Sequence, residues 1–205
     1  MPETEVVGIF VKAPVAGRVK TRLAADIGPI GAAALYRRLG RQVVATASSD
    51  AHQTVVWYAP ATGGRLVRAW LDGLGVSGFR AQPDGDLGDR LRIAFATHFR
   101  EGACRVVIIG SDCPGVDRQV ISEAFAALDH HDVVLGPARD GGYYLIGMQA
   151  LHEPLFRGMP WSSFAVLNET RAAACALGLT CHLLSPLRDV DTIADARALG
   201  LVPVQ

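Results

Sequence analysis

Residues 106–109, Val-Val-Ile-Ile, form a continuous run of β-branched side chains near the middle of the chain. Such a run predicts a strand that is buried on both faces, as in a parallel sheet covered by helices. The run leads into Gly110-Ser111-Asp112, which is small and polar. Ligands of open α/β sheets bind at the carboxyl ends of the strands. Asp112 therefore stands where a site would be built, although it could equally cap the helix that follows or form an Asx turn.

Apolar strand patterns and amphipathic helix patterns alternate along the chain as far as residue 128. This alternation predicts an α/β protein with three layers, in which helices cover both faces of a mostly parallel sheet. The strand at 143–148 follows its predecessor too closely for a helical crossover, so we expect it to be antiparallel or at an edge. We expect strands at 6–11, 54–59, 79–82, 105–110, 132–137, 143–148 and 180–184, and helices at 29–47, 63–74, 86–100, 117–128, 151–156, 164–177 and 192–199.

The bulk properties bound the classes of function. Lys and Arg together number 20 and Asp and Glu number 20, so the formal net charge is zero, which argues against a dedicated nucleic-acid or membrane-surface protein. No apolar run is long enough to span a bilayer. The four cysteines form neither a C-x-x-C motif nor a zinc pattern, and we expect a reducing, cytoplasmic environment. Without linkers or repeats, a single domain over 1–205 is the simplest organisation.

A basic loop follows the first predicted strand. It carries Lys12, Gly17, Arg18, Lys20 and Arg22, and it leaves the strand where phosphate-binding loops occur in nucleotide-binding α/β folds. Several cations beside a flexible glycine suit a diphosphate or triphosphate group. The alternative is a solvated basic loop without a ligand.

A second candidate segment, Gly85-Asp86-Leu87-Gly88-Asp89-Arg90, lies at another strand-to-helix junction. Asp86 and Asp89 could simply cap the helix. Gly85 and Gly88 would also allow a planar ligand to approach the backbone, with Arg90 at the same end of the sheet.

Two acidic segments complete the set of candidates. Asp140-Gly141-Gly142 follows the strand at 132–137 and either forms a tight turn or lines a substrate site. Asp191 lies just before the final helix, where a carboxylate is favoured by the helix dipole and could simply cap the helix. If Asp112 and Asp191 meet at one edge of the sheet, they suit Mg²⁺ or Mn²⁺, which bind carboxylate and phosphate oxygens.

Five motifs in this order resemble a known bacterial family. They are K-A-P-x-x-G-x-V-K-T-R-L at 12–23, G-D-L-G-x-R at 85–90, G-S-D-C-P at 110–114, G-P-A-x-D-G-G-Y-Y-L-I-G at 136–147 and D-V-D-T at 189–192. The chain thereby resembles the GT-A-like transferases known as DUF2064. It is more distantly similar to 2-phospholactate guanylyltransferase and molybdenum cofactor guanylyltransferase.

The resemblance implies the fold of the nucleotide-diphospho-sugar transferases. It also implies that Asp112 and Asp191 bind the divalent ion and that Lys12, Lys20 and Arg22 contact the nucleotide phosphates.

Our leading hypothesis is a metal-dependent nucleotidyltransferase that joins the nucleotide of an NTP to a small phosphorylated or anionic acceptor and releases pyrophosphate. Asp112 and Lys20 would be catalytic. Gly17, Gly85 and Arg90 would join Lys12, Lys20 and Arg22 at the nucleotide, and the segment 140–142 would bind the acceptor. The alternatives are an NDP-sugar-dependent glycosyltransferase and a nucleotide-binding protein without catalysis. The sequence is compatible with a homo-oligomer and favours no particular base.

Overall fold

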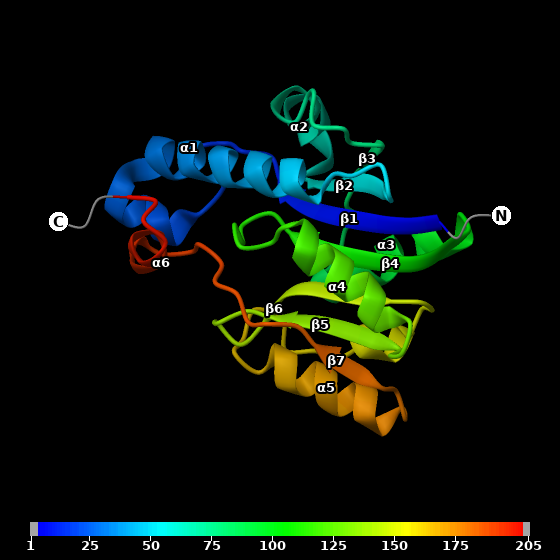
Figure 1. The fold of residues 1–205 in the computed structure, drawn as a ribbon. Coiled ribbons are helices and arrows are strands. Elements are labelled where there is room, and N and C mark those ends of the chain that lie inside the picture. Colours follow the sequence, from blue (N-terminus) through cyan, green and yellow to red (C-terminus); the bar gives the residue numbers. More distant parts are fainter. Residues whose placement is uncertain (1–3, 203–205) are drawn as a thin grey trace.

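A seven-stranded sheet runs through the centre of the computed structural model, which describes residues 4–202 (Figure 1). The strands follow the order β3-β2-β1-β4-β6-β5-β7. Strand β6 is antiparallel to both of its neighbours, and all other pairs are parallel. The strands are β1 (Thr4–Lys12), β2 (Gln53–Ala59), β3 (Gly78–Ala81), β4 (Ala103–Gly110), β5 (Val133–Pro137), β6 (Tyr143–Met148) and β7 (Cys181–Leu183).

Helices cover both faces of this sheet (Figure 1). Helices α1, α2 and α4 pack on one face, and α3, α5 and the short helix η2 pack on the other. The predicted three-layer, mostly parallel α/β fold is confirmed. The helices are α1 (Thr21–Ala47), η1 (Ala61–Gly63), α2 (Gly64–Trp70), α3 (Leu87–Arg100), α4 (Arg118–Leu128), η2 (Glu153–Phe156), α5 (Val166–Ala176) and α6 (Ile193–Ala198).

The β-branched run at the centre of the chain becomes the inner strand β4. Its side chains alternate between the two faces, with Val107 and Ile109 in one core cluster and Val106 and Ile108 in the other. All four are at most 3% exposed, as expected for a strand covered on both faces. Within residues 4–202, every helix lacks either the length or the apolarity that crossing a lipid bilayer demands.

Helix α1 differs most from the prediction. It begins at Thr21 rather than at Pro29, and Gly28 interrupts it with φ 73° and ψ 159°, outside helical geometry. The predicted helix from 29 is therefore only the second part, which Pro29 opens at a position where its missing N–H costs nothing. The first part begins inside the predicted basic loop and shortens that loop.

Strand β6 is antiparallel, which confirms one of the two alternatives for it, and it lies between β4 and β5. Two other expectations need correction. The helix expected at 63–74 ends at Trp70, and the one expected at 151–156 is a single 3₁₀ turn containing Pro154. The remaining elements lie within two residues of their predicted bounds.

Candidate active site

Two adjoining cavities open at the carboxyl ends of β1 and β4, and they share Arg22, Asp112, Trp161 and Asp191 among their lining residues. The larger one, of about 670 Å³, we call the basic lobe, and its polar lining residues include Lys12, Lys20, Arg22, Tyr36, Gln82, Asp86, Arg90, Ser111, Asp112 and Asp191. The smaller one, of about 480 Å³, we call the acidic lobe, and its polar lining residues include Arg22, Asp112, Asp140, Tyr143, Tyr144, Ser162, Asp189 and Asp191.

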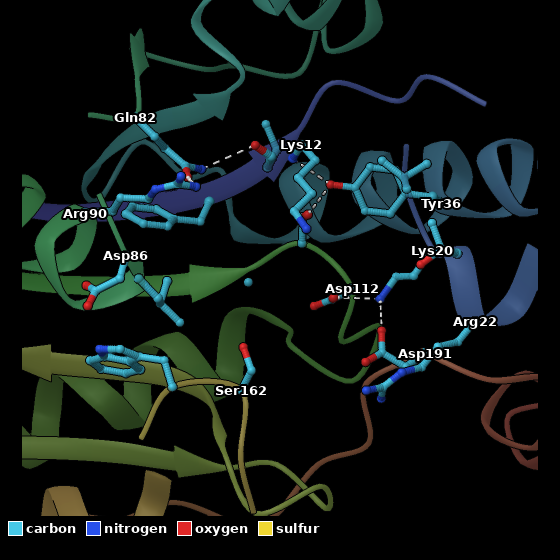
Figure 2. A pocket seen from close by; sticks show the side chains of 18 of the residues that line it. Lys12, Lys20, Arg22, Tyr36, Gln82, Asp86, Arg90, Asp112, Ser162 and Asp191 are labelled. Carbon is cyan, nitrogen blue, oxygen red and sulfur yellow. Dashed lines mark hydrogen bonds and ion pairs between the residues drawn. The ribbon is translucent and has the colours of Figure 1, made fainter. Parts of the chain in front are cut away.

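Lys20 holds the two predicted metal-binding carboxylates together where the lobes meet. Figure 2 shows its side chain between Asp112 and Asp191. Its Nζ lies 2.7 Å from Asp112 Oδ2 and 2.7 Å from Asp191 Oδ1, so these oxygens are at most twice that distance apart. The lysine side chain is 6% exposed, whereas the carboxylates are 37% and 40% exposed. The two carboxylates therefore converge on one cation and keep a face toward the cleft.

The charge of Lys20 is stabilised by these partners. Burial by itself would lower the pKa of Lys20, but the negative charges and hydrogen bonds of Asp112 and Asp191 outweigh burial and raise the pKa above its usual value. The ammonium therefore remains protonated near neutral pH. It offsets the repulsion that two neighbouring carboxylates would otherwise have.

The backbone before α1 places Lys20 in this position. Lys20 has φ 49° and ψ 49°, the left-handed conformation that costs a non-glycine residue free energy. Gly17 also has a positive φ of 77°, and a Cβ built there would meet nothing within 4 Å. Gly17 lines neither cavity, and its positive φ turns the loop that leads to Lys20.

Other residues satisfy the helix termini that Asp112 and Asp191 could have capped. Asp117 accepts the Val120 N–H at the start of α4. Thr192 and Asp195 form a capping box at the start of α6, as their spacing indicates. The capping interpretation of Asp112 and Asp191 is therefore wrong, and both side chains are available to the cleft.

A backbone hydrogen bond joins the two carboxylate-bearing segments. The Val190 N–H donates to the Asp112 carbonyl at 3.0 Å, which brings the turn before α6 against the end of β4. The Cys113 thiol, which is fully buried, donates to the Arg188 carbonyl at 3.4 Å. Burial raises the pKa of Cys113 to about 12. Cys113 is thus a packed thiol rather than a thiolate nucleophile.

Tyr36 forms the floor of the basic lobe, a role that sequence reasoning missed. Its hydroxyl accepts the backbone N–H of Lys12 at 2.8 Å and lies 2.9 Å from Ser111 Oγ. Burial raises the pKa of Tyr36, so the phenol stays neutral. These bonds connect the ends of β1 and β4 and leave the Lys12 side chain exposed in the lobe.

The segment at 85–90 borders the basic lobe through Gly85, Asp86, Leu87 and Arg90. Asp86 caps α3 by accepting the Asp89 N–H at 2.9 Å, and Arg90 Nε donates to the Gly85 carbonyl at 3.1 Å. Gly88 does not offer the expected approach to a planar ligand. A Cβ there would lie 2.5 Å from the Phe156 carbonyl oxygen and 2.7 Å from Trp161 Nε1, so protein atoms already occupy that space.

The segment at 140–142 borders the acidic lobe through Asp140 and Gly142. Asp140 Oδ1 accepts the Gly142 N–H at 2.9 Å in a tight turn. Gly141 does not line the lobe. It packs against the backbone of Phe164, and its φ of 90° and a Cβ position 2.2 Å from the Phe164 carbonyl oxygen both require glycine.

Sequence reasoning also passed over Asp189 and Trp161. Asp189 shares a motif with Asp191 and lies half-buried in the acidic lobe. Burial and then the negative charge of Asp140 raise the pKa of Asp189 to about 6. Trp161 lines both lobes. A tryptophan in a serine-rich loop outside any helix or strand is the one signal that could have drawn attention to it.

The carboxylate pair fits a divalent cation only in part. Two carboxylates that converge within hydrogen-bonding distance of one ammonium are suitable oxygen ligands for Mg²⁺ or Mn²⁺. Among residues 4–202, no group of three or more His, Cys, Asp and Glu side chains is arranged to hold a metal. The other ligands would therefore be phosphate oxygens and water, as is usual for Mg²⁺.

Comparison with known proteins places the chain in context. A family model described as an uncharacterized protein conserved in bacteria (DUF2064) matches residues 42–163. A solved structure from Desulfovibrio desulfuricans G20, provisionally described as a nucleotide-diphospho-sugar transferase, is 33% identical with a TM-score of 0.90. That match covers 96% of this chain and 86% of the other. No curated protein matches the sequence.

More distant structures share the fold. CMP:2-keto-3-deoxy-manno-octonic acid synthetase, solved with CTP, is 13% identical with a TM-score of 0.57, covering 97% of this chain and 99% of its own. Rv0371c from Mycobacterium tuberculosis H37Rv, solved with manganese, is 18% identical with a TM-score of 0.56, covering 96% and 98%. The expected nucleotide-diphospho-sugar transferase fold is thereby confirmed.

Proposed function

We propose that this protein, which belongs to the DUF2064 family, is a nucleotidyltransferase that joins the nucleotide of an NTP to a small acceptor. An atom of the acceptor would bond to the α-phosphorus, and the bond from that phosphorus to the oxygen bridging to the β-phosphate would break. Pyrophosphate would leave, and any proton carried by the attacking atom would pass to water. The solved structure with CTP supports the nucleotide class without identifying the base.

The observation that carries this proposal is the position of the Asp112–Lys20–Asp191 group at the boundary of two lobes. A transferase must hold a donor and an acceptor on either side of the reacting phosphorus. A cleft with two compartments and a charged centre shared between them meets this requirement. Catalysis of phosphoryl and nucleotidyl transfer rests mostly on such positioning and charge neutralisation.

The basic lobe is the expected place for the triphosphate. Lys12, Arg22 and Arg90 line it, and the Lys12 and Arg22 side chains are exposed to the cleft (Figure 2). Their charges can neutralise phosphate oxygens of the donor. Lys20 keeps the two carboxylates together. If a metal ion also bound these carboxylates, the Lys20 ammonium could contact a phosphate oxygen of the donor.

Asp112 and Asp191 would hold Mg²⁺ or Mn²⁺ together with phosphate oxygens. When bound, the ion would neutralise the charge that develops on the leaving pyrophosphate. The manganese found in the distant structure of Rv0371c supports testing both metals.

The test is pyrophosphate release from a panel of NTPs with candidate acceptors, with Mg²⁺, with Mn²⁺ and with EDTA. We expect metal-dependent release with at least one NTP. Asp112→Asn and Asp191→Asn should each reduce the rate by about 10²-fold or more, because each removes charge aimed at the reacting group. Asp50→Asn is the matched control and should leave the rate unchanged. Asp50 is exposed and precedes β2, at the amino ends of the strands and away from the cleft. Full activity of Asp112→Asn would refute the assignment.

A second candidate is an NDP-sugar-dependent glycosyltransferase, which the description of the Desulfovibrio desulfuricans structure favours. It would release a nucleoside diphosphate instead of pyrophosphate. A parallel panel of NDP-sugars therefore separates the two transferases by product. A nucleotide-binding protein without catalysis would bind nucleotide in both panels and release neither product.

A further inference from the structure

The two lobes differ in the sign of their charged lining. The basic lobe has four basic and three acidic side chains, whereas the acidic lobe has one basic and four acidic side chains. Asp112, Asp191 and Arg22 belong to both lobes, so the difference comes from the remaining groups. Those of the basic lobe are Lys12, Lys20, Asp86 and Arg90, and those of the acidic lobe are Asp140 and Asp189.

Asp140 and Asp189 have no counter-ion in the described part of the chain. The side chain of Asp140 accepts only the Gly142 N–H, and no basic side chain forms an ion pair with either carboxylate. The other carboxylate pair of the cleft is bridged by Lys20. Both carboxylates line the same cavity. A pair of this kind repels a further anion and favours a ligand that donates hydrogen bonds or carries positive charge.

Aromatic side chains form another part of the lining of the acidic lobe. Tyr143, Trp161 and Phe164 line the acidic lobe, and Phe164 is 83% exposed. An exposed aromatic ring beside carboxylates contacts the carbon skeleton of a small ligand while the carboxylates take its polar groups. A cationic nitrogen would also be attracted to the ring faces.

We infer that the acceptor carries no anionic group and presents hydroxyl or ammonium donors to Asp140 and Asp189. This inference rests on the proposed function and replaces the phosphorylated or anionic acceptor expected from the sequence. The reacting atom of the acceptor is then a hydroxyl oxygen or an amine nitrogen, and the product is a phosphodiester or a phosphoramidate rather than a new pyrophosphate bond.

The experiment measures binding of three probes with one carbon skeleton, namely glucose, glucosamine and glucose 6-phosphate, by ligand-observed NMR. Saturating inorganic triphosphate is present throughout, so that the phosphate of the third probe cannot bind in the basic lobe. We expect wild-type protein to bind glucose or glucosamine about tenfold tighter than glucose 6-phosphate, because like charges oppose the phosphate. Asp140→Asn combined with Asp189→Asn should abolish or invert this preference. The control, Asp50→Asn combined with Asp72→Asn, makes the same charge change at exposed positions that do not line either lobe.

Tighter binding of glucose 6-phosphate by the wild type, or an unchanged preference in the Asp140/Asp189 variant, would overturn the inference. Asp140→Asn alone guards against misfolding of the double variant, because Asp140 is exposed and asparagine can still accept the Gly142 N–H. Comparing the affinities of glucose and glucosamine shows whether the lobe prefers a hydroxyl group or an ammonium group as the donor. A charge preference without any NTP turnover would contradict the proposed function, and with it the role of the bound ligand as an acceptor, while the charge selectivity of the acidic lobe itself would be established.

Discussion

Lys20 combines a strained backbone with a buried side chain, and both properties place its ammonium between Asp112 and Asp191. Its left-handed conformation turns the chain into α1, and its ammonium lies between two carboxylates that come from the ends of β4 and of the segment before α6. Such strain persists only where surrounding contacts hold it. In this protein the holding contacts are the two ion pairs.

Replacing Lys20 tests this interpretation. Lys20→Met should lower turnover by about 10²-fold, because it removes the charge shared by Asp112 and Asp191. The stability should fall by only about 1 kcal/mol, because both carboxylates are more than one-third exposed and water screens their repulsion. Pyrophosphate release and urea unfolding measure the two effects. Arg18→Met, in the same loop and outside the cavity lining, is the control, and an equal loss of turnover there would contradict the assignment.

A second residue-level prediction concerns Gly141. Gly141→Ala should destabilise the protein more than Gly102→Ala, although both residues have φ near 90°. Both variants pay about 1 kcal/mol for a left-handed alanine. At Gly141 the new Cβ would also meet the Phe164 backbone at 2.2 Å, whereas at Gly102 it would meet nothing within 4 Å. Urea unfolding of the two variants checks the difference, and equal losses would show that the Phe164 segment simply moves aside.

Among the elements, α3 packs on the sheet through a polar contact inside an apolar core. His98 is 2% exposed, and its Nε2 accepts the Trp57 N–H from β2 at 3.0 Å. That bond needs the neutral imidazole, since a protonated ring has no acceptor. Burial, together with the charge of Arg80, lowers the pKa of His98 to about 4. The junction between α3 and β2 therefore depends on pH.

The stability of this junction should weaken on acidification. Between pH 6.5 and about pH 4 the unfolded chain binds a proton at His98 that the folded protein does not bind. The contribution of neutral His98 to the free energy of unfolding is therefore full above pH 6.5 and declines below it. We expect the contribution to fall by about 2 kcal/mol between pH 7 and pH 5. His98→Gln keeps an acceptor for Trp57 without titrating. Urea unfolding at both pH values should show a smaller loss in this variant than in the wild type, and equal losses would contradict the assignment.

For the molecule as a whole, the direction of the strands brings the candidate residues to one edge. Six strands run one way and β6 runs against them, so the ends of β1, β4 and β5 face the same side of the sheet. The turn between β5 and β6 then lies beside the end of β4 and supplies the acidic lobe with Asp140. The antiparallel strand thus places the β5–β6 turn where it lines the acidic lobe.

The separation of the lobes predicts separable kinetic effects. Lys12→Ala should raise the KM for NTP by about tenfold and leave the KM for the acceptor unchanged, because Lys12 lines only the basic lobe. Arg22→Ala should raise both constants, because Arg22 lines both lobes. Arg18→Ala serves as the control and should change neither. An effect of Lys12→Ala on the acceptor alone would reverse the assignment of the lobes.

Local pattern was enough to predict most of the fold. The β-branched run of β4, the alternation of strands with helices and the capping pair Thr192 and Asp195 all depend on neighbours in the sequence, and the structure has them as expected. The end of β4 then indicated Asp112, because ligands bind at the carboxyl ends of parallel strands. Asp191 was indicated by its place before the final helix and by the family resemblance. The start of α1 was missed because the chain is helical both before and after the non-helical residue Gly28, and no local pattern reveals this.

Contacts between distant segments decided the rest. Only the folded chain brings Lys20 between Asp112 and Asp191, buries Tyr36 under Lys12 and leaves Asp140 and Asp189 without a counter-ion among the described residues. It also gives Gly88 and Gly141 protein neighbours where the sequence suggested ligands. These outcomes depend on which side chains share a space, and residue spacing along the chain carries no such information. By itself the sequence determined most helices and strands and the strand ends at which the site lies. The tertiary structure determined how the charged side chains are distributed between the two lobes.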